Sequence, residues 1–211
     1  MARREKHLNT GIVERYDIDT LGAPFKVSLI NSVEVKFDPA TGEEIVEIPD
    51  LCGLINAVVR TRVMHPRKLN GAELKFVRKS LDLKSKDIAR FLDVSLEHWS
   101  RCESNAKVLS GASEKLFRLF AFMASYFRKP NDTLIAVMNQ QASKGMDKEE
   151  RTKMENEFAN FFIRMKIESV FSADDDLEFS FVRQVRSNDN KSPLGKGSPN
   201  SDGWSPNQKA A

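Results

Sequence analysis

The chain has 211 residues, of which 40% are hydrophobic and 30% charged, with a net charge of +3; such values suit one compact unit with appendages or two small units. No apolar run approaches the roughly 20 residues of a membrane-spanning helix, and the basic start lacks the apolar stretch of a signal peptide. We therefore expect a cytoplasmic protein with no membrane partner.

The first predicted elements form a small antiparallel sheet over residues 24–48. Residues 24–37 are rich in β-branched and aromatic side chains, and Ile45–Ile48 form a returning strand after the turn sequence Asp38–Gly42. Apolar residues then recur at helical spacing, so we predict an amphipathic helix over about 51–62, capped by Asp50.

Residues 66–129 predict four short helices and carry most of the positive charge. Asn70 and Glu73 have the spacing of a capping box at the start of the first helix. This segment has 14 Lys and Arg against 7 Asp and Glu, whereas 1–65 has 8 against 10, 130–186 has 8 against 11, and 187–211 has 3 against 2. Focused positive charge suits a polyanion-binding surface, although a solvated lysine-rich face is the plain alternative.

The C-terminal part predicts helices of about 132–142 and 147–171, followed by a strand over 177–185. Residues 187–211 include 15 Ser, Gly, Pro or Asn among 25, so we expect a disordered tail. The predicted fold class is therefore mainly α with a small antiparallel β element (α+β). Its expected domains are an N-terminal element (1–65), a helix-turn-helix domain (66–129), a C-terminal part that can dimerise (130–186) and the tail.

The stretch Leu83–Glu103 meets the physical requirements of a helix-turn-helix unit. Such a unit needs a small residue where its two helices cross, here Ala89, and a turn residue that tolerates the left-handed region, here Asp93. Trp99 can fill the angle between the helices, and Ser95 can cap the second helix, so we expect Trp99 in the core.

The residues Arg78-Lys79, Ala89 and Ser100–Glu103 resemble the pattern of the Xre/Cro family of helix-turn-helix repressors. The wider range 24–79 is also similar to the junction between the two halves of antitoxins related to MqsA, but lacks their zinc-binding cysteines. Family members place Ser or Thr where Lys84 stands, so we expect Ser85 to cap the helix here.

The family resemblance implies that a recognition helix at about 95–104 enters the DNA major groove. Arg101 can donate to guanine, Glu97 can accept from cytosine, and Leu96 can contact a thymine methyl group. The alternatives are a structural or phosphate-binding Arg101 and a solvated Glu97 favoured by the helix dipole. The residues expected to face bases are Leu96, Glu97, Ser100 and Arg101, and those expected to contact phosphate are Lys84, Ser85, Lys86, Arg78 and Lys107.

Metal and catalytic chemistry find little support in the sequence. Cys52 and Cys102 are too far apart along the chain for a zinc ribbon, and we expect them to be reduced thiols. The three histidines are too scattered to replace the missing cysteines. Asp174–Asp176 lack the glycine and the spaced oxygen ligands of a calcium loop. There is no Gly-rich phosphate loop or nucleophile elbow. We predict no metal, no cofactor and no enzymatic activity.

Together these features predict a sequence-specific DNA-binding transcriptional regulator, expected to be a repressor. We expect a homodimer on double-stranded DNA, since a single helix-turn-helix unit reads few base pairs. The alternative is an antitoxin or anti-activator that acts mainly through a protein partner such as a toxin, because Leu96 and Glu97 are unusual base-facing residues.

Overall fold

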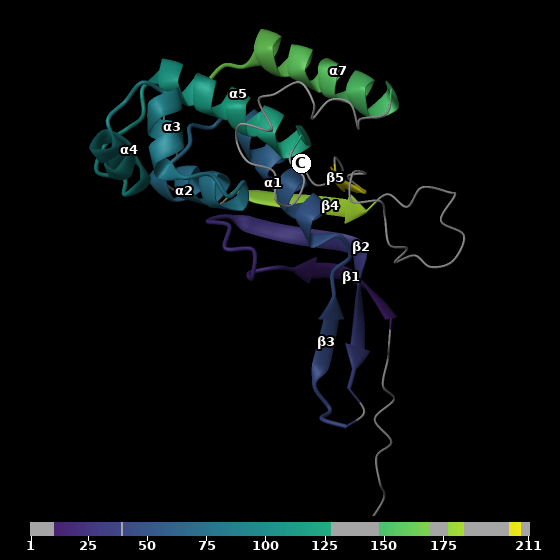
Figure 1. The fold of residues 1–211 in the computed structure, drawn as a ribbon. Helices are drawn as coiled ribbons and strands as arrows, with labels where there is room; N and C mark the ends of the chain where they lie inside the picture. The colour runs from purple at the N-terminus through teal and green to yellow at the C-terminus, as the bar shows by residue number, and fades with distance from the viewer. Residues whose placement is uncertain (1–10, 39, 128–147, 169–176, 184–202, 208–211) are drawn as a thin grey trace, which may run out of the picture.

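The computed structural model describes residues 11–38, 40–127, 148–168, 177–183 and 203–207. Figure 1 shows a sheet covered on one side by helices. The elements are β1 (Gly11–Asp17), β2 (Lys26–Phe37), β3 (Glu44–Glu47), α1 (Leu51–Met64), α2 (Gly71–Ser80), α3 (Ser85–Phe91), α4 (Leu96–Glu103), α5 (Gly111–Phe127), α7 (Lys148–Arg164), β4 (Glu178–Arg183) and β5 (Trp204–Pro206).

The sheet has five strands and mixed topology. Its order is β1-β2-β4-β5, and β3 pairs with the second half of β2. β1 and β3 run antiparallel to β2, whereas β4 runs parallel to it, with Lys26 opposite Glu178 and Ile30 opposite Val182. β5 then pairs antiparallel with β4. The sheet is thus built from both ends of the chain.

The predicted fold class, mainly α with a small antiparallel β element, is therefore wrong. β1 was not expected, because its exposed polar residues leave only weak alternation. The pairing of β4 with β2 joins segments about 150 residues apart along the chain, which no local pattern reveals. The prediction of a disordered tail over residues 187–211 is also wrong for Trp204–Pro206, because these residues form β5.

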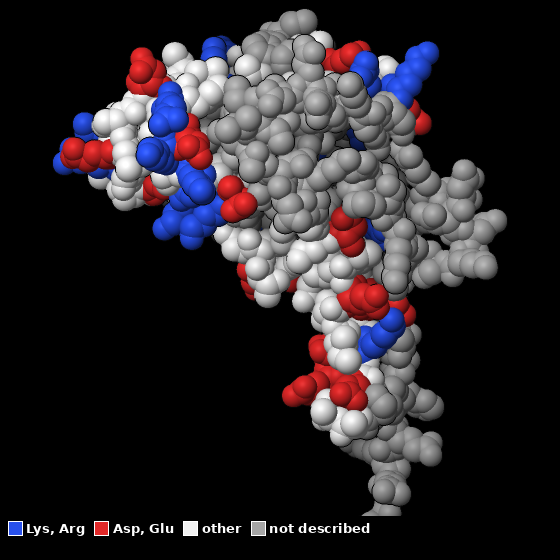
Figure 2. Space-filling model, viewed as in Figure 1, with Lys and Arg blue, Asp and Glu red and all other residues white. Residues whose placement is uncertain are grey.

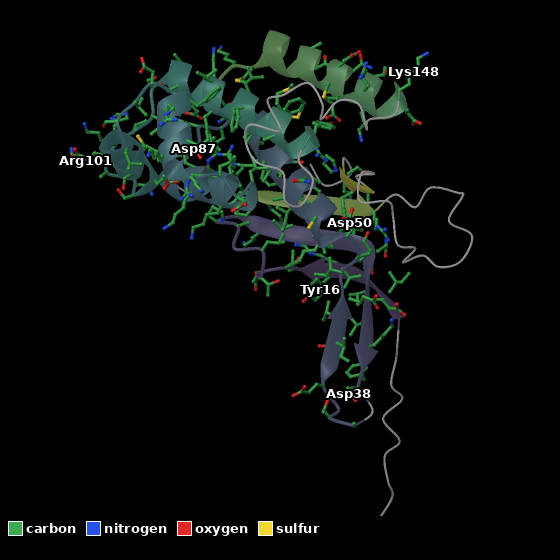
Figure 3. The ribbon with its side chains drawn as sticks, in the orientation of Figure 1. Tyr16, Asp38, Asp50, Asp87, Arg101 and Lys148 are labelled. Carbon is green, nitrogen blue, oxygen red and sulfur yellow. The ribbon has the colours of Figure 1, made fainter. Side chains whose placement is uncertain are left out.

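β2 bends in its middle, and the bend divides the sheet. Asn31 has a φ of 48°, a left-handed conformation that Asn tolerates better than most residues. Beside it the β1–β2 register shifts between Val13 and Arg15. Beyond the bend, β2, β3 and the start of β1 form an arm that projects from the body, with Asp38 near its tip (Figures 1 and 3).

The helices form layers on the sheet. In Figure 1, α1 lies next to β4, α5 packs along α1, α7 is outermost, and α2, α3 and α4 lie together at one end. One hydrophobic cluster runs through these layers and includes Leu29 of β2, Val58 of α1, Phe117 of α5 and Phe181 of β4. The predicted N-terminal, helical and C-terminal segments thus share a core.

Most predicted local features are confirmed. Asp50 caps α1 through the Gly53 amide, and Asn70 and Glu73 form the expected capping box of α2. The strand predicted at 177–185 is β4, whereas the helix predicted from Asp147 to about Phe171 ends at Arg164. The helix expected at 132–142 lies outside the described residues. Cys52 and Cys102 are free thiols, as expected.

A buried ion pair joins α1 to α2. The fully buried Arg62 guanidinium donates to both carboxylate oxygens of Glu73, each at 2.8 Å. It also donates to the carbonyls of Arg67 and Lys68, both at 3.0 Å. Because Glu73 accepts the Asn70 amide at 2.8 Å as well, one carboxylate both caps α2 and binds α1.

A second buried pair holds the same turn from the side of α5. Arg118 donates to Glu114 at 2.7 Å and 3.0 Å, and to carbonyl oxygens that include those of Val63 at 3.0 Å and Arg67 at 2.6 Å. Glu114 accepts the Leu69 amide at 2.9 Å. Burial lowers the pKa of the Arg118 guanidinium, and Glu114 opposes that shift. We call these two pairs the buried clamp.

The clamp predicts a large effect for Arg118. Replacing it by Met leaves the buried Glu114 with Lys68 as its one remaining cation among the described residues, at 3.3 Å, and removes a donor from the turn carbonyls. Arg118→Met should therefore lower the free energy of unfolding by about 3 kcal/mol. Lys115 follows Glu114 directly but is exposed, so Lys115→Met should change the free energy of unfolding by less than about 0.5 kcal/mol. Urea unfolding measures both, and similar losses in the two variants would contradict the clamp.

His65, in the clamped turn, predicts a pH dependence. Burial, followed by the Arg62 charge, lowers the pKa of His65, and its Nδ1 accepts the Arg67 amide at 3.2 Å. The unfolded chain therefore takes up the proton first as the pH falls below about 6.5, so the free energy of unfolding should fall with it. Asn keeps a hydrogen-bond acceptor but does not titrate. In His65→Asn, the free energy of unfolding, measured by urea unfolding, should therefore change less between about pH 7 and pH 5. An unchanged slope would exclude His65 as the cause.

Candidate nucleic-acid interface

α3 and α4 are two short helices joined by a tight turn, at the place where the sequence predicts a helix-turn-helix unit, and we call this pair the unit. They contact each other, and in the turn Asp93 has a φ of 52° while the Val94 amide donates to the Ala89 carbonyl at 3.0 Å. Ser95 caps α4 by accepting the His98 amide at 3.0 Å. These predictions for Asp93 and Ser95 are confirmed, and the turn has the required local geometry.

The inner side of α4 is fixed in the core. Trp99 is fully buried, as predicted, and its ring lies 5.2 Å from that of Phe117 in α5. The start of α2 comes so close to the end of α4 that a Cβ on Gly71 would lie 2.4 Å from the Cys102 carbonyl oxygen, so only glycine fits there.

Burial also raises the pKa of the Cys102 thiol, which keeps it protonated rather than nucleophilic.

The outer side of α4 carries all four residues that were expected to face bases. Leu96 is 52% exposed, and Ser100 is exposed one turn later. The side chains of Glu97 and Arg101 are 76% and 52% exposed and form an i,i+4 ion pair at 3.4 Å. Figure 3 shows Arg101 projecting outward from α4, away from the sheet. The structure therefore brings these four residues together on one accessible helix.

Positive charge dominates the exposed surface of this region. From residue 66 to 127, eight Lys and Arg side chains are exposed against three Asp and Glu. Glu73, Glu114 and Glu103 are turned inward onto arginines. Arg78 and Arg118 are turned inward with them, so the surface keeps the excess of cations that the sequence already has in this segment. In Figure 2, basic side chains gather over α2, α3 and α4 with some acidic ones among them, and acidic side chains outnumber basic ones over the arm. The exposed cations are Lys75, Lys79, Lys84, Lys86, Arg90, Arg101, Lys107 and Lys115.

Four of the five residues expected to contact phosphate lie at or near the surface, whereas Arg78 is held within the fold. Lys84, Lys86 and Lys107 are exposed beside the unit, and Ser85 is half-buried at the first position of α3. The prediction that Ser85 caps α3 is wrong: Lys84 occupies the capping position, with no side-chain hydrogen bond. A lysine side chain has no hydrogen-bond acceptor, so Lys84 cannot cap the backbone amides in the first turn of α3.

Arg78 is held within the fold. Its guanidinium donates to the two carboxylate oxygens of Glu103 at 2.6 Å and 3.2 Å, and to the Leu83 carbonyl at 3.0 Å. It thereby joins α2, the turn before α3 and the end of α4. A phosphate contact by Arg78 has to compete with this ion pair.

Arg90 is an exposed cation that the sequence reasoning missed. It lies four residues after Lys86 in α3, so the two side chains share one helix face. The i,i+4 spacing of the two cations was the signal that could have identified it.

The described residues offer little to competing chemistries. Among them, no group of three or more His, Cys, Asp or Glu is placed to hold a metal ion. No described helix combines the length and apolar character that crossing a bilayer requires. Comparison with protein-family models, curated proteins and solved structures gave no match, so a functional assignment has to come from the site itself.

The different roles of Arg78 and Arg101 predict different effects of replacing them. Arg78→Ala leaves Glu103 and the Leu83 carbonyl without their partner and should lower the free energy of unfolding by about 2 kcal/mol. Arg101→Ala removes an exposed pair and should lower it by less than about 0.5 kcal/mol. Urea unfolding of the two variants tests this, and equal losses would show that Arg101 is also structural.

Proposed function

We propose that this protein is a sequence-specific DNA-binding regulator of transcription that places α4 in the major groove. One observation carries the proposal: exposed cations surround a helix-turn-helix unit whose second helix has an accessible outer side. A DNA duplex presents closely spaced phosphates that such charge can neutralise, and its major groove accommodates a helix. The Xre/Cro resemblance of Arg78-Lys79, Ala89 and Ser100–Glu103 supports the same reading.

In this proposal, phosphate contacts position the unit and α4 reads the bases. Lys84 and Lys86 at the start of α3, and Lys107 after α4, bind the DNA backbone. Arg101 exchanges its exposed ion pair with Glu97 for two hydrogen bonds to guanine, a favourable exchange because an exposed pair at 3.4 Å contributes little. The freed Glu97 then accepts from a cytosine amino group.

We further propose that the regulator acts as a homodimer. A unit of about sixty residues buries limited surface on DNA, and pairing two units raises both affinity and specificity. Two-fold symmetry then requires an operator with two related half-sites, whose centres lie about 10 base pairs or a multiple apart.

A protein-interaction role, as an antitoxin or anti-activator, is the second candidate. It is favoured by exposed apolar side chains in the same region: Leu96 is 52% and Val108 is 60% exposed. Both are poor ligands for phosphate but suit the centre of a protein interface. In that case a toxin-like protein, not DNA, would cover α4.

The test is binding of the full chain to a random duplex library at several salt concentrations. We expect enrichment of a two-fold symmetric site and affinity that falls steeply with salt. Lys86→Ala should weaken all sequences alike and flatten the salt slope by about one unit. Arg101→Ala should cost roughly 1–3 kcal/mol on the preferred site only.

Lys153→Ala is the matched control, because Lys153 is exposed on α7, away from the unit. It should bind as the wild type does. Absence of binding at low salt would refute the DNA proposal, and equal loss on every sequence for Arg101→Ala would make Arg101 a phosphate contact. A selected site without internal symmetry would contradict the dimer.

A further inference from the structure

The segment 203–207 is bound to the fold mainly through one side chain. Trp204 is 1% exposed, while Gly203, Ser205 and Asn207 are half-buried and Pro206 is exposed. The Trp204 indole N–H lies 3.1 Å and 3.2 Å from the carbonyl oxygens of Pro49 and Asp50, just before α1. Its neighbours are thus β4 on one side and the start of α1 on the other. We call the space between them, which the Trp204 side chain fills, the groove.

Backbone pairing provides the second part of the contact. Ser205 lies opposite Val182, and the Asn207 amide donates to the Ser180 carbonyl at 2.8 Å. Because hydrogen-bonding positions alternate along an antiparallel pair, the nitrogen of Pro206 points away from β4. Proline, which has no N–H, is therefore tolerated at this position. Strand addition combined with a pocket for a side chain is a recognised way for proteins to bind extended peptides, and here the side chain is the Trp204 indole.

The chain connection does not force this pairing. β4 ends at Arg183 and β5 begins at Trp204, so 20 residues separate two adjacent antiparallel strands. A hairpin needs only two to about five. The pairing of β5 with β4 is therefore not that of a tight hairpin, and the contacts described above are what attach the segment to the fold, as they would attach a tethered ligand.

We propose that the groove between β4 and the start of α1 is a peptide-recognition site for an extended segment with a tryptophan anchor. Its resident ligand is the chain's own segment Gly203–Asn207, bound in cis and releasable while the rest of the fold persists. A tethered ligand acts at an effective concentration of about the millimolar range. A partner that presents an indole on an extended strand can therefore enter only by outcompeting the tail.

The experiment uses the full chain with a specific protease site inserted between residues 190 and 198. After cleavage, a fluorescein-labelled peptide of residues 200–209 is added, and its anisotropy reports binding. The peptide should exchange into the cut protein. On uncut wild type its apparent affinity should be roughly tenfold weaker or worse, because the tether keeps the groove occupied.

Two competitor peptides separate the anchor from the backbone contact. The Trp204→Ala peptide should compete roughly 30-fold less well or worse, as expected for loss of a buried aromatic anchor. The matched Pro206→Ala peptide should compete within about threefold, because that side chain is exposed and its nitrogen points outward.

Circular dichroism after cleavage checks that the fold persists. Unfolding on cleavage, retention of the cut segment without exchange over a day, or equal competition by the Trp204→Ala peptide would each overturn the proposal. Gel filtration of uncut protein over a range of concentrations checks the occupant. A dimer that disappears in the Trp204→Phe or Trp204→Ala chain would place the tail in a second copy and overturn binding in cis.

Discussion

The fold depends on the buried clamp around residues 63–70. Burying a charge is costly unless it is paired and its hydrogen-bonding capacity is satisfied, and here Arg62 and Arg118 are paired with Glu73 and Glu114 and also bind backbone carbonyls of the turn. The turn connects α1, which packs near the sheet, to α2, which begins the helical region. Because α5 supplies the second pair, three helices are fixed relative to one another by directional contacts, which apolar packing alone does not provide.

The buried pairs do not create the positive surface that we propose for DNA. Between residues 66 and 127 the sequence has 12 Lys and Arg against 7 Asp and Glu, and eight against three are exposed, so the excess of five cations is the same in both counts. The pairs instead decide which charges face outward, because Glu73, Glu103 and Glu114 bind arginines inside the fold while most lysines remain exposed. The Arg78–Glu103 pair in addition fixes the end of α4.

Most local requirements of the backbone could be predicted from the sequence, the exception being the cap of α3, where Lys84 and not Ser85 occupies the capping position. Asn70 with Glu73, Ser95 and Asp93 were identified because each satisfies a need of the backbone within a few residues. Sequence reasoning failed where the partner is remote, as for β4 beside β2. It also missed the clamp, although Arg62 lies four residues after Val58 on the apolar side of α1, where a charge needs a buried partner. That periodicity was the available signal for half of the pair, and only the fold supplies Glu73.

Pro206 has a consequence for how the molecule behaves at high concentration. An open sheet offers its outermost strands as templates on which further chains can add, and natural proteins interrupt such growth. Here the outward-facing nitrogen of Pro206 cannot donate to another strand, and β1, at the opposite side, carries Arg15 and Asp17 next to its register shift. β3, the remaining outer strand, is only four residues long and has Glu44 and Glu47 at its ends. Each outer strand of the described sheet is thus a poor template for the addition of another chain.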